Sequence, residues 1–363
     1  MLKVIHVVGA RPNFVKIAPV IAALNEVKHD LNQILLHTGQ HYDQNMSGVF
    51  FKDLNINQAD EHLGIGSGTH AEQTSAAMVG CERMFKKYEP DLVVVVGDVN
   101  STLAAAVTAA KMRIKLAHVE SGLRSYDRSM PEEHNRVVTD HLSDILFTPS
   151  EDASSNLYRE GIAKHRIHFV GNVMIDSLIN QLPHRPKLNE IKIAGLSGLK
   201  NRHYALLTLH RPSNVDNPSV ISEIFKGLKP LSDEMPVIFP AHPRTRDQLE
   251  NIDTDHVTIC EPFGYREFLS LESHARLVLT DSGGIQEETT YLGVPCITIR
   301  ENTERPITIT DGTNVLASPQ NLADTVRKKL SGKSQDKTNK IKFWDGKTAK
   351  RIADIITSKE WMN

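Results

Sequence analysis

The chain is short of the residues that mark several protein classes. Its 363 residues include only three cysteines, Cys81, Cys260 and Cys296, which lie far apart and form no C-x-x-C pair. This spacing indicates neither a disulfide framework nor a zinc site, and it suits a reducing cytoplasm. No stretch approaches the roughly 18 apolar residues of a membrane span, and the apolar run at the N-terminus is too short for a signal peptide. We therefore expect a soluble, cytoplasmic protein that has no membrane partner.

The chain also lacks an excess of either charge. Its 42 Lys and Arg residues and 44 Asp and Glu residues give a formal net charge of -2. No overall basic field is available to attract nucleic acid, so any bound anion must be met by local groups. The length is too great for one average domain and fits two domains of roughly 150 to 200 residues each.

What the sequence does contain is a regular series of short, β-branched runs between helical stretches. The first half has KVIHVV, QILLHTG, DLVVVVGD, IKLAHVES and DILFTPS, and the second half has YALLTLH, PVIFPA, VTICEP, LVLTDS and PCITIR. Continuously apolar strands separated by helices indicate parallel sheets covered on both faces. We predict the α/β class with two doubly wound domains, residues 1–180 and 181–345, followed by a last helix at about 346–358.

In such sheets, ligands bind beyond the carboxyl ends of the strands, so the polar residues there are candidates. After the first run, Arg11 and Lys16 flank the start of a helix, where a bound anion would explain two cations that oppose the helix dipole. Solvated surface cations are the alternative. Asp98, Glu120 and Glu132 follow two further runs and would supply acid and base groups if they converge. For Asp98 a turn or cap role is the alternative.

The second half places a different set of groups at its strand ends. His210 ends one run, and Arg305 follows another. The stretch TDSGGIQEE places Ser282, Gly283 and Gly284 at a helix start, where N–H groups and the dipole favour a phosphate. Glu287 is interpreted as a first-turn residue that complements the dipole.

Motifs for common cofactors are weak or missing. No G-x-G-x-x-G opens a helix after the first run, and GIGSGT, residues 64–69, has no strand before it. His37 and His41 have the spacing of a zinc motif, but they straddle a strand end. We expect neither a nicotinamide nor a metal.

Six ordered motifs carry a resemblance to a known family: GARPNFVK, GDVNST, HVESGLRS, MPEEHNR, TLHRPSN and TDSGGIQEE…RENTERP. From the first strand to about residue 315, the chain resembles the non-hydrolysing UDP-N-acetylglucosamine 2-epimerases. The resemblance implies a glycosyltransferase-B-like pair of Rossmann-like domains around a deep cleft, with the C-terminal segment, residues 346–363, packing back on the first domain. It also implies a homodimer, interconversion of UDP-N-acetylglucosamine and UDP-N-acetylmannosamine, and no cofactor.

The family's mechanism is elimination of UDP to a 2-acetamidoglucal, followed by re-addition after C2 is protonated on its opposite face. Residue by residue, the resemblance makes Asp98, Glu120, Glu132 and His210 the catalytic groups. It implies a substrate-binding set of Arg11, Lys16, Phe263, Phe268, Ser282, Gly283, Gly284, Glu288 and Arg305. Within that set, Ser282, Gly283 and Gly284 form the diphosphate cradle, Glu288 binds the ribose, and the two phenylalanines lie near the uracil.

Two departures from the family pattern keep other functions open. Pro212 stands where many members have an arginine that holds an allosteric UDP-N-acetylglucosamine, and part of the same set is replaced at residues 40–43. The alternatives are a 2-epimerase of a modified substrate such as UDP-2,3-diacetamido-glucuronate, a glycosyltransferase of the same fold, and a non-catalytic UDP-sugar sensor.

Overall fold

The computed structural model describes residues 1–27, 30–39, 58–196, 198–250, 252–331 and 341–362. The chain divides into two compact units, unit 1 (Met1–Ile179 with Lys342–Asn363) and unit 2 (Asn180–Ile341). The C-terminal segment therefore belongs to the first unit. Among the helices in the described ranges, none has the length and apolarity needed to cross a membrane.

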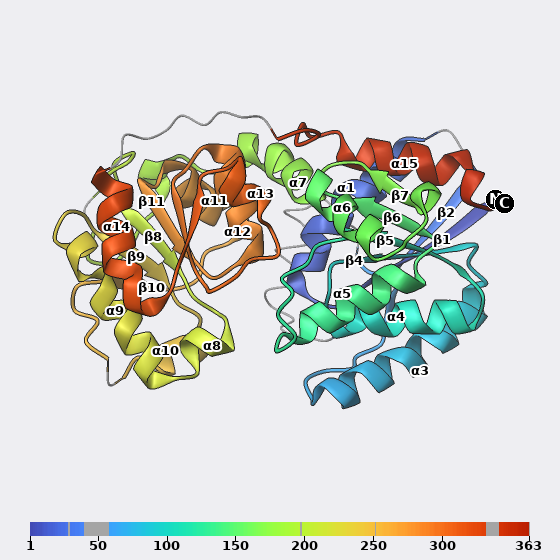
Figure 1. Cartoon of the computed structure of the whole chain (residues 1–363), viewed down its shortest axis with the longest axis horizontal. Coiled ribbons are helices and arrows are strands. Elements are labelled where there is room, and N and C mark those ends of the chain that lie inside the picture. Colours follow the sequence, from blue (N-terminus) through green and yellow to red (C-terminus); the bar gives the residue numbers. More distant parts are fainter. Residues whose placement is uncertain (28–29, 40–57, 197, 251, 332–340, 363) are drawn as a thin grey trace. The chain divides into compact units, whose positions relative to one another are not determined.

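Unit 1 is built on a parallel sheet whose described strands follow the order β3-β2-β1-β4-β5-β6-β7. Its strands are β1 (Leu2–Val8), β2 (Leu31–His37), β3 (Glu61–His62), β4 (Leu92–Val96), β5 (Lys115–Val119), β6 (Ile145–Thr148) and β7 (Ile167–Phe169). Its helices are α1 (Arg11–Glu26), α3 (His70–Tyr88), α4 (Asn100–Lys111), α5 (Pro131–Leu142), α6 (Glu151–Arg159), α7 (Val173–Gln181) and α15 (Thr348–Ser358) (Figure 1).

Unit 2 is built on a second parallel sheet, with the order β10-β9-β8-β11-β12-β13. Its strands are β8 (Ala205–Thr208), β9 (Val237–Pro240), β10 (Thr258–Cys260), β11 (Leu277–Thr280), β12 (Cys296–Ile299) and β13 (Asn314–Ala317). Its helices are α8 (Pro212–Val215), α9 (Pro218–Ser232), α10 (Pro243–Asp247), α11 (Tyr265–His274), α12 (Gly283–Leu292), α13 (Ile307–Thr310) and α14 (Leu322–Ser331).

The two sheets share one topology. When the strands of unit 2 are counted from β8, both orders become the 3-2-1-4-5-6 order of a Rossmann fold, and unit 1 adds a seventh strand. In each unit the strand order reverses beside the first strand, between β1 and β4 in unit 1 and between β8 and β11 in unit 2. Ligands of open α/β sheets bind at the carboxyl ends of the strands at this reversal. The topology thus predicts a ligand site at each of the two strand-order reversals.

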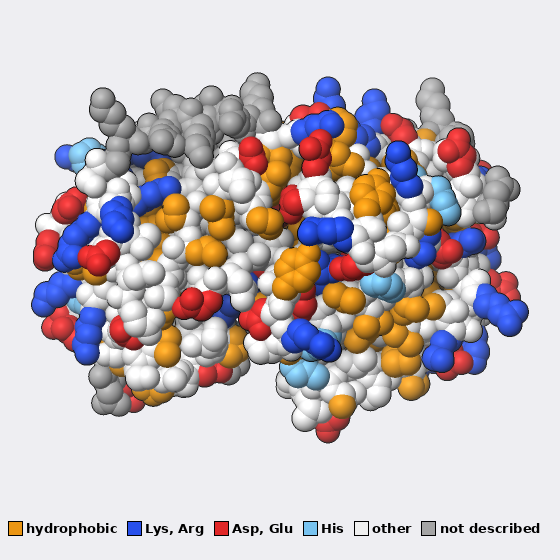
Figure 2. All heavy atoms as spheres, viewed as in Figure 1, with side chains coloured by type: hydrophobic (Ala, Val, Ile, Leu, Met, Phe, Trp, Pro, Cys, Tyr) orange, Lys and Arg blue, Asp and Glu red, His pale blue; other side chains and the backbone are white. Residues whose placement is uncertain are grey.

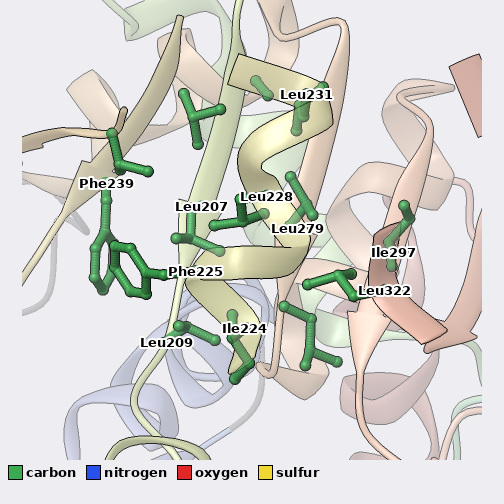
Figure 3. Packing of buried hydrophobic residues seen from close by; sticks show 14 of the residues in the cluster. Leu207, Leu209, Ile224, Phe225, Leu228, Leu231, Phe239, Leu279, Ile297 and Leu322 are labelled. Carbon is green, nitrogen blue, oxygen red and sulfur yellow. The ribbon is translucent and has the colours of Figure 1, made fainter. Parts of the chain in front are cut away.

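Alternation along the strands of unit 2 explains why both faces of its sheet are covered. Leu207 and Leu279 belong to the apolar cluster that packs against α9 and α14, and Figure 3 shows these leucines together with Phe225 of α9. Their neighbours Leu206 and Val278 belong to a separate cluster on the α11 and α12 side. Since successive strand side chains point to opposite faces, a continuously apolar strand buries both.

The C-terminal segment is held to unit 1 by specific contacts. The helix α15 packs on α1, with Ile352 and Ile356 fully buried. Ahead of the helix, Trp344 donates its indole N–H to the carbonyl of Pro149 at 3.2 Å. The N–H of Ala349 in the first turn donates to Asp176 Oδ2 at 2.7 Å. These contacts position the segment on the first unit although 162 residues of unit 2 lie between.

The prediction of two doubly wound α/β halves is confirmed, and each of the ten predicted runs is a strand. Three described strands were missed, β3, β7 and β13, of two, three and four residues. Such short segments carry too few residues for a periodic pattern to stand out.

On the face in Figure 2, acidic and basic side chains are interspersed, in keeping with the small net charge.

Candidate active site

At the strand-order reversal of unit 1, Glu120 and Lys16 form a buried ion pair. Glu120 directly follows β5 and has a left-handed backbone, with φ of 71°. Such a conformation is uncommon and costly for a residue other than glycine, and it occurs preferentially at functional sites. Lys16 reaches Glu120 from the second turn of α1. Beside them lies Gly97, where a Cβ would be 3.3 Å from Lys16 Nζ and 3.5 Å from Glu120 Oε2.

Asp98 comes next in the same turn after β4, so it lies beside that pair. Arg136 of α5 holds its carboxylate with a 2.5 Å contact from Nη2 to Oδ2, and Asn135 donates to its backbone carbonyl at 2.9 Å. The Asp98 side chain remains 26% exposed, so it is oriented and still open to a ligand. Glu132, in the first turn of α5, is half-buried and has no polar partner among the described residues.

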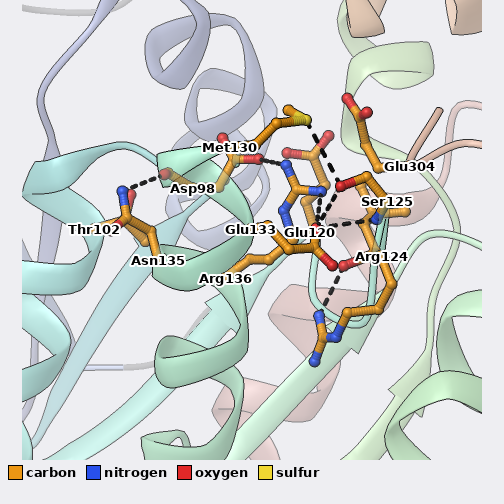
Figure 4. Close-up of polar contacts among 12 residues, drawn as sticks. Asp98, Thr102, Glu120, Arg124, Ser125, Met130, Glu133, Asn135, Arg136 and Glu304 are labelled. Atoms are coloured by element: carbon orange, nitrogen blue, oxygen red, sulfur yellow. Dashed lines mark hydrogen bonds and ion pairs between the residues drawn. The ribbon is translucent and has the colours of Figure 1, made fainter. Parts of the chain in front are cut away.

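Glu133, the neighbour of Glu132, has a structural role. Its carboxylate accepts from the N–H groups of Ser125 and Tyr126 at 3.0 and 2.9 Å, and from Arg136 at 3.0 Å. Figure 4 shows Arg136 bridging Glu133 and Asp98. The same arginine thus ties the loop that follows Glu120 to the catalytic candidate Asp98.

A second buried network, centred on Asp140, also holds that loop. The carboxylate of Asp140 contacts His118 Nδ1 at 2.6 Å and Arg124 Nη1 at 2.7 Å, while His118 Nε2 bonds the carbonyl of Gly97 at 2.8 Å. Burial alone would raise the pKa of Asp140, but the charges and hydrogen bonds of His118 and Arg124 lower it. The network connects β5 and α5 to the Gly97 turn and so positions Asp98.

In unit 2, a carboxylate holds the catalytic candidate His210. Asp281, which directly follows β11, is fully buried and contacts His210 Nδ1 at 2.8 Å. It also accepts from the N–H of Arg211 at 3.0 Å and from Asn214 at 3.1 Å. Burial would raise the pKa of Asp281, but His210 and these N–H groups lower it. The His210 side chain is 63% exposed, so its Nε2 is directed away from the anchoring carboxylate.

The start of α12 lies beside an arginine cluster. Ser282 is the N-cap residue, and its own N–H donates to Thr280 Oγ1 at 2.9 Å. No N-cap side chain bonds the N–H groups of the first helical turn. A Cβ on Gly283 would be 2.4 Å from Arg305 Nη1, so only glycine lets the helix start approach that guanidinium. Arg305 is paired with the buried Glu304, which also contacts Arg300 at 2.7 Å. The uncapped N–H groups and the arginines form a place suited to a diphosphate.

Of the two glutamates of TDSGGIQEE, Glu287 differs from what the sequence predicts. It is not a first-turn residue that complements the dipole. It lies in the second turn, is 1% exposed, and pairs with Arg305 Nε at 3.0 Å. Glu288 is also almost fully buried, at 3% exposure, and accepts from the hydroxyl of Tyr265 at 2.6 Å. Burial raises the pKa of Glu288 to about 7. The interpretation of Glu287 was wrong because helix periodicity does not reveal which charges a fold buries.

Three further residues of the predicted substrate-binding set are Phe263, Phe268 and Arg11. Phe263 and Phe268 are half-buried against the apolar cluster of α11 and α12. Arg11 begins α1, but its side chain lies outside the described residues, as do residues 40–43. The described residues contain no group of three or more His, Cys, Asp and Glu side chains that could hold a metal ion.

Sequence reasoning missed Asp281, Arg136 and Tyr265 as supporting residues. Asp281 stands inside the motif TDSGG, whose glycines indicate a phosphate site, and its bond to His210 joins residues 71 positions apart. The available signal was that Asp281 directly follows β11 and His210 lies two residues after β8, and a Rossmann order makes these two strands neighbours.

Comparison with known proteins identifies the family to which the chain belongs. A family model described as UDP-N-acetylglucosamine 2-epimerase matches residues 23–357. The chain belongs to the UDP-N-acetylglucosamine 2-epimerase family. A UDP-N-acetylglucosamine 2-epimerase of Methanococcus maripaludis is 44% identical over 98% of both chains.

Other members of the epimerase family sharpen the comparison. A crystal structure of the Methanocaldococcus jannaschii UDP-GlcNAc 2-epimerase, in complex with UDP-GlcNAc and UDP, is 41% identical. It has a TM-score of 0.88 and covers 98% of this chain and 100% of that one. A UDP-2,3-diacetamido-2,3-dideoxy-D-glucuronate 2-epimerase of Pseudomonas aeruginosa is 38% identical over 98% of this chain and 99% of its own. The predicted family and its fold are therefore confirmed.

Proposed function

We propose that this epimerase inverts C2 of UDP-N-acetylglucosamine to give UDP-N-acetylmannosamine. The observation that carries the proposal is the meeting of Lys16, Glu120 and Asp98 at the strand-order reversal of unit 1. Proton removal from a sugar carbon needs a base held in place, and protonation from the other face needs an acid. The family membership supports the choice of a UDP-linked 2-acetamido sugar.

The reaction proceeds in two balanced steps. In the first, a carboxylate takes the C2 proton, the C–H electron pair forms the C1=C2 double bond, and UDP leaves C1 with the pair of the C1–O bond. In the second, a phosphate oxygen of UDP adds to C1 of the 2-acetamidoglucal as an acid protonates the opposite face of C2. Asp98, Glu120 and Glu132 are the acid and base candidates. Arg136 contacts Asp98 and Lys16 contacts Glu120, so the two basic groups orient these carboxylates.

Unit 2 holds the nucleotide in this proposal. The uncapped start of α12 at Ser282, Gly283 and Gly284 receives the diphosphate, and Arg305 neutralises part of the charge that develops as UDP leaves. Glu288 accepts from ribose hydroxyls. His210, anchored through Nδ1 by Asp281, presents Nε2 for proton transfer or for a hydrogen bond to the departing phosphate.

The test is incubation of the protein with UDP-N-acetylglucosamine in deuterated water, followed by proton NMR. The proposal predicts the manno epimer and deuterium at C2 of both epimers, without any added acceptor. Absence of both products rejects this substrate. Turnover that requires an acceptor identifies a glycosyltransferase instead.

One relative favours a second candidate substrate. The Pseudomonas aeruginosa protein, named for its action on a diacetamido glucuronate, is 38% identical over nearly the whole length. We therefore infer UDP-2,3-diacetamido-glucuronate as the alternative. A protein that leaves UDP-N-acetylglucosamine unchanged and incorporates deuterium at C2 of this uronic acid belongs to that branch.

We also propose a cytoplasmic location and a homodimer. The three cysteines are free thiols, which suits a reducing compartment, and the dimer follows from the resemblance to the family. Light scattering on the purified protein tests the dimer, because a mass near 81 kDa, twice about 40.5 kDa, is expected. A mass near that of one chain contradicts it.

A further inference from the structure

Behind the proposed ribose ligand Glu288 lies a second buried carboxyl group, that of Glu272. Glu272 is fully buried near the end of α11, close enough to Glu288 for the two carboxyl groups to share a hydrogen bond when one of them is protonated. Neither of its carboxyl oxygens accepts a hydrogen bond from any donor in the described structure. A bond between two carboxyl groups requires a proton on one of them, so the pair carries at most one negative charge.

The proton belongs on Glu272. Glu288 also accepts from the Tyr265 hydroxyl at 2.6 Å, and accepting from two donors favours the ionised form. Glu272 has no such donor. Burial, and then the charge of Glu288, raise the pKa of Glu272 well above its ordinary value. Fully buried carboxyl groups can be kept neutral in this way to act as hydrogen-bond donors.

Helix spacing explains how the two donors reach one acceptor. Tyr265 and Glu272 are seven residues apart on α11, which is close to two helical turns, so they lie on the same face of the helix. That face is turned toward α12 and Glu288. A further titratable group near the pair is Cys296 of β12, and burial raises the pKa of its thiol to about 12. Cys296 therefore stays neutral and does not compete for the proton.

We propose that Glu272 is a positioning residue which, as a neutral acid, donates to Glu288 and with Tyr265 holds it as a carboxylate ready for the ribose. A carboxylate offers about four acceptor positions. Tyr265 and Glu272 use two of them, and two remain for the 2′ and 3′ hydroxyls. This inference rests on the proposed function, since it assumes that Glu288 receives the ribose of a UDP-sugar.

The test is the dissociation constant for UDP-N-acetylglucosamine between pH 5.5 and 8.5, measured by equilibrium dialysis. This diphosphate diester has no proton to lose in that window, so the protein supplies the pH dependence. With the pKa of Glu288 at about 7, roughly one tenth of it is ionised at pH 6, and the affinity of the wild type falls about tenfold between pH 8 and pH 6.

Three variants separate the donor role of Glu272 from simple packing. Glu272→Gln keeps an N–H donor and should stay within about threefold of the wild type at every pH. Glu272→Leu keeps the volume and loses the donor, so its pH midpoint should rise and its affinity at pH 7 should fall about tenfold. Glu288→Gln should bind with a flat pH profile. Thermal unfolding of each variant establishes that it is folded.

Each outcome decides the inference. A wild-type profile without pH dependence, a Leu variant that matches or exceeds the wild type, or a Gln variant as weak as the Leu variant overturns it. Failure of the proposed function gives a different result, because the wild type then binds no UDP-N-acetylglucosamine at any pH. If Glu272→Leu does not fold, Tyr265→Phe removes the other donor and must raise the pH midpoint in the same direction. An unchanged midpoint there contradicts the inference.

Discussion

The two units have the same strand order, yet they place different residues at a helix start near the strand-order reversal. No N-cap side chain bonds the first turn of α1 in unit 1 or of α12 in unit 2. Before α1, Asn13 Oδ1 accepts from the N–H groups of Gly9 and Ala10 at 3.2 and 3.0 Å. The helix α12 instead begins with Gly283 and Gly284, and its start lies beside Arg305.

The charged residues near these helix starts also differ. Unit 1 places Asp98 in contact with Arg136 and Glu120 in contact with Lys16. Unit 2 places Arg305 against Gly283. Because the two units share one topology, the residues at the strand ends must set the chemistry of each. In the proposed function, unit 1 therefore transfers the proton at C2 and unit 2 binds the nucleotide.

The largest expected effect comes from Asp98→Asn. The amide keeps the shape and loses the ionisable group, so kcat should fall about 10²-fold or more. The dissociation constant for UDP should change less than threefold, because unit 2 is untouched. Steady-state kinetics and calorimetry measure the two quantities. Glu82→Gln changes an exposed carboxylate that pairs with Lys86; it is the matched control and should leave both unchanged. A fall in kcat of less than tenfold removes Asp98 from the catalytic set.

The complementary change is Gly283→Ala in unit 2. The new methyl group would lie 2.4 Å from Arg305 Nη1, so the guanidinium must move away from the helix start. UDP affinity should weaken about tenfold, which corresponds to about 1.4 kcal/mol. Gly68→Ala, where the nearest neighbour of the new Cβ is a flexible glutamate at 3.1 Å, is the control. Unaltered UDP binding by Gly283→Ala would show that the diphosphate lies elsewhere.

A smaller effect is expected from Asp281→Asn. The amide cannot supply the ionised carboxylate that contacts His210, so the imidazole becomes less well oriented. We therefore expect kcat to fall about tenfold, with a smaller change in KM. The pH profile of kcat should also shift, because the charge beside His210 is removed. A kcat and a pH profile equal to those of the wild type would show that catalysis does not depend on the contact between Asp281 and His210.

The smallest effect concerns stability against pH. Since the pKa of Glu288 is raised from 4.5 to about 7, the folded state binds more protons than the unfolded state between these values. Stability should therefore rise as pH falls from 7 toward 4.5. Glu288→Gln removes this contribution, so the wild type should gain about 2 to 6 °C in Tm relative to the variant between pH 8 and pH 5.5. Parallel Tm profiles for the two proteins would contradict the raised pKa.

Much of the fold follows from local patterns, and the site follows only in part. Runs such as DLVVVVGD predict buried parallel strands because their apolar residues are continuous, and the glycines of TDSGG predict a helix start. The burial of Glu287 and Glu288 was not predictable, because their partners Arg305 and Tyr265 lie 18 positions after and 23 before them. Contacts over such separations depend on the strand order, which no local pattern states.

The most direct test of the division between the units is the rate of deuterium incorporation at C2 as a function of UDP-N-acetylglucosamine concentration, in Asp98→Asn and Gly283→Ala. We expect Asp98→Asn to keep the half-saturating concentration of the wild type and to lose about 10²-fold or more of the maximal rate. We expect Gly283→Ala to keep the maximal rate within about threefold and to need about tenfold more substrate. If Asp98→Asn instead changes only the half-saturating concentration, or Gly283→Ala only the maximal rate, the assignment of roles to the two units is wrong.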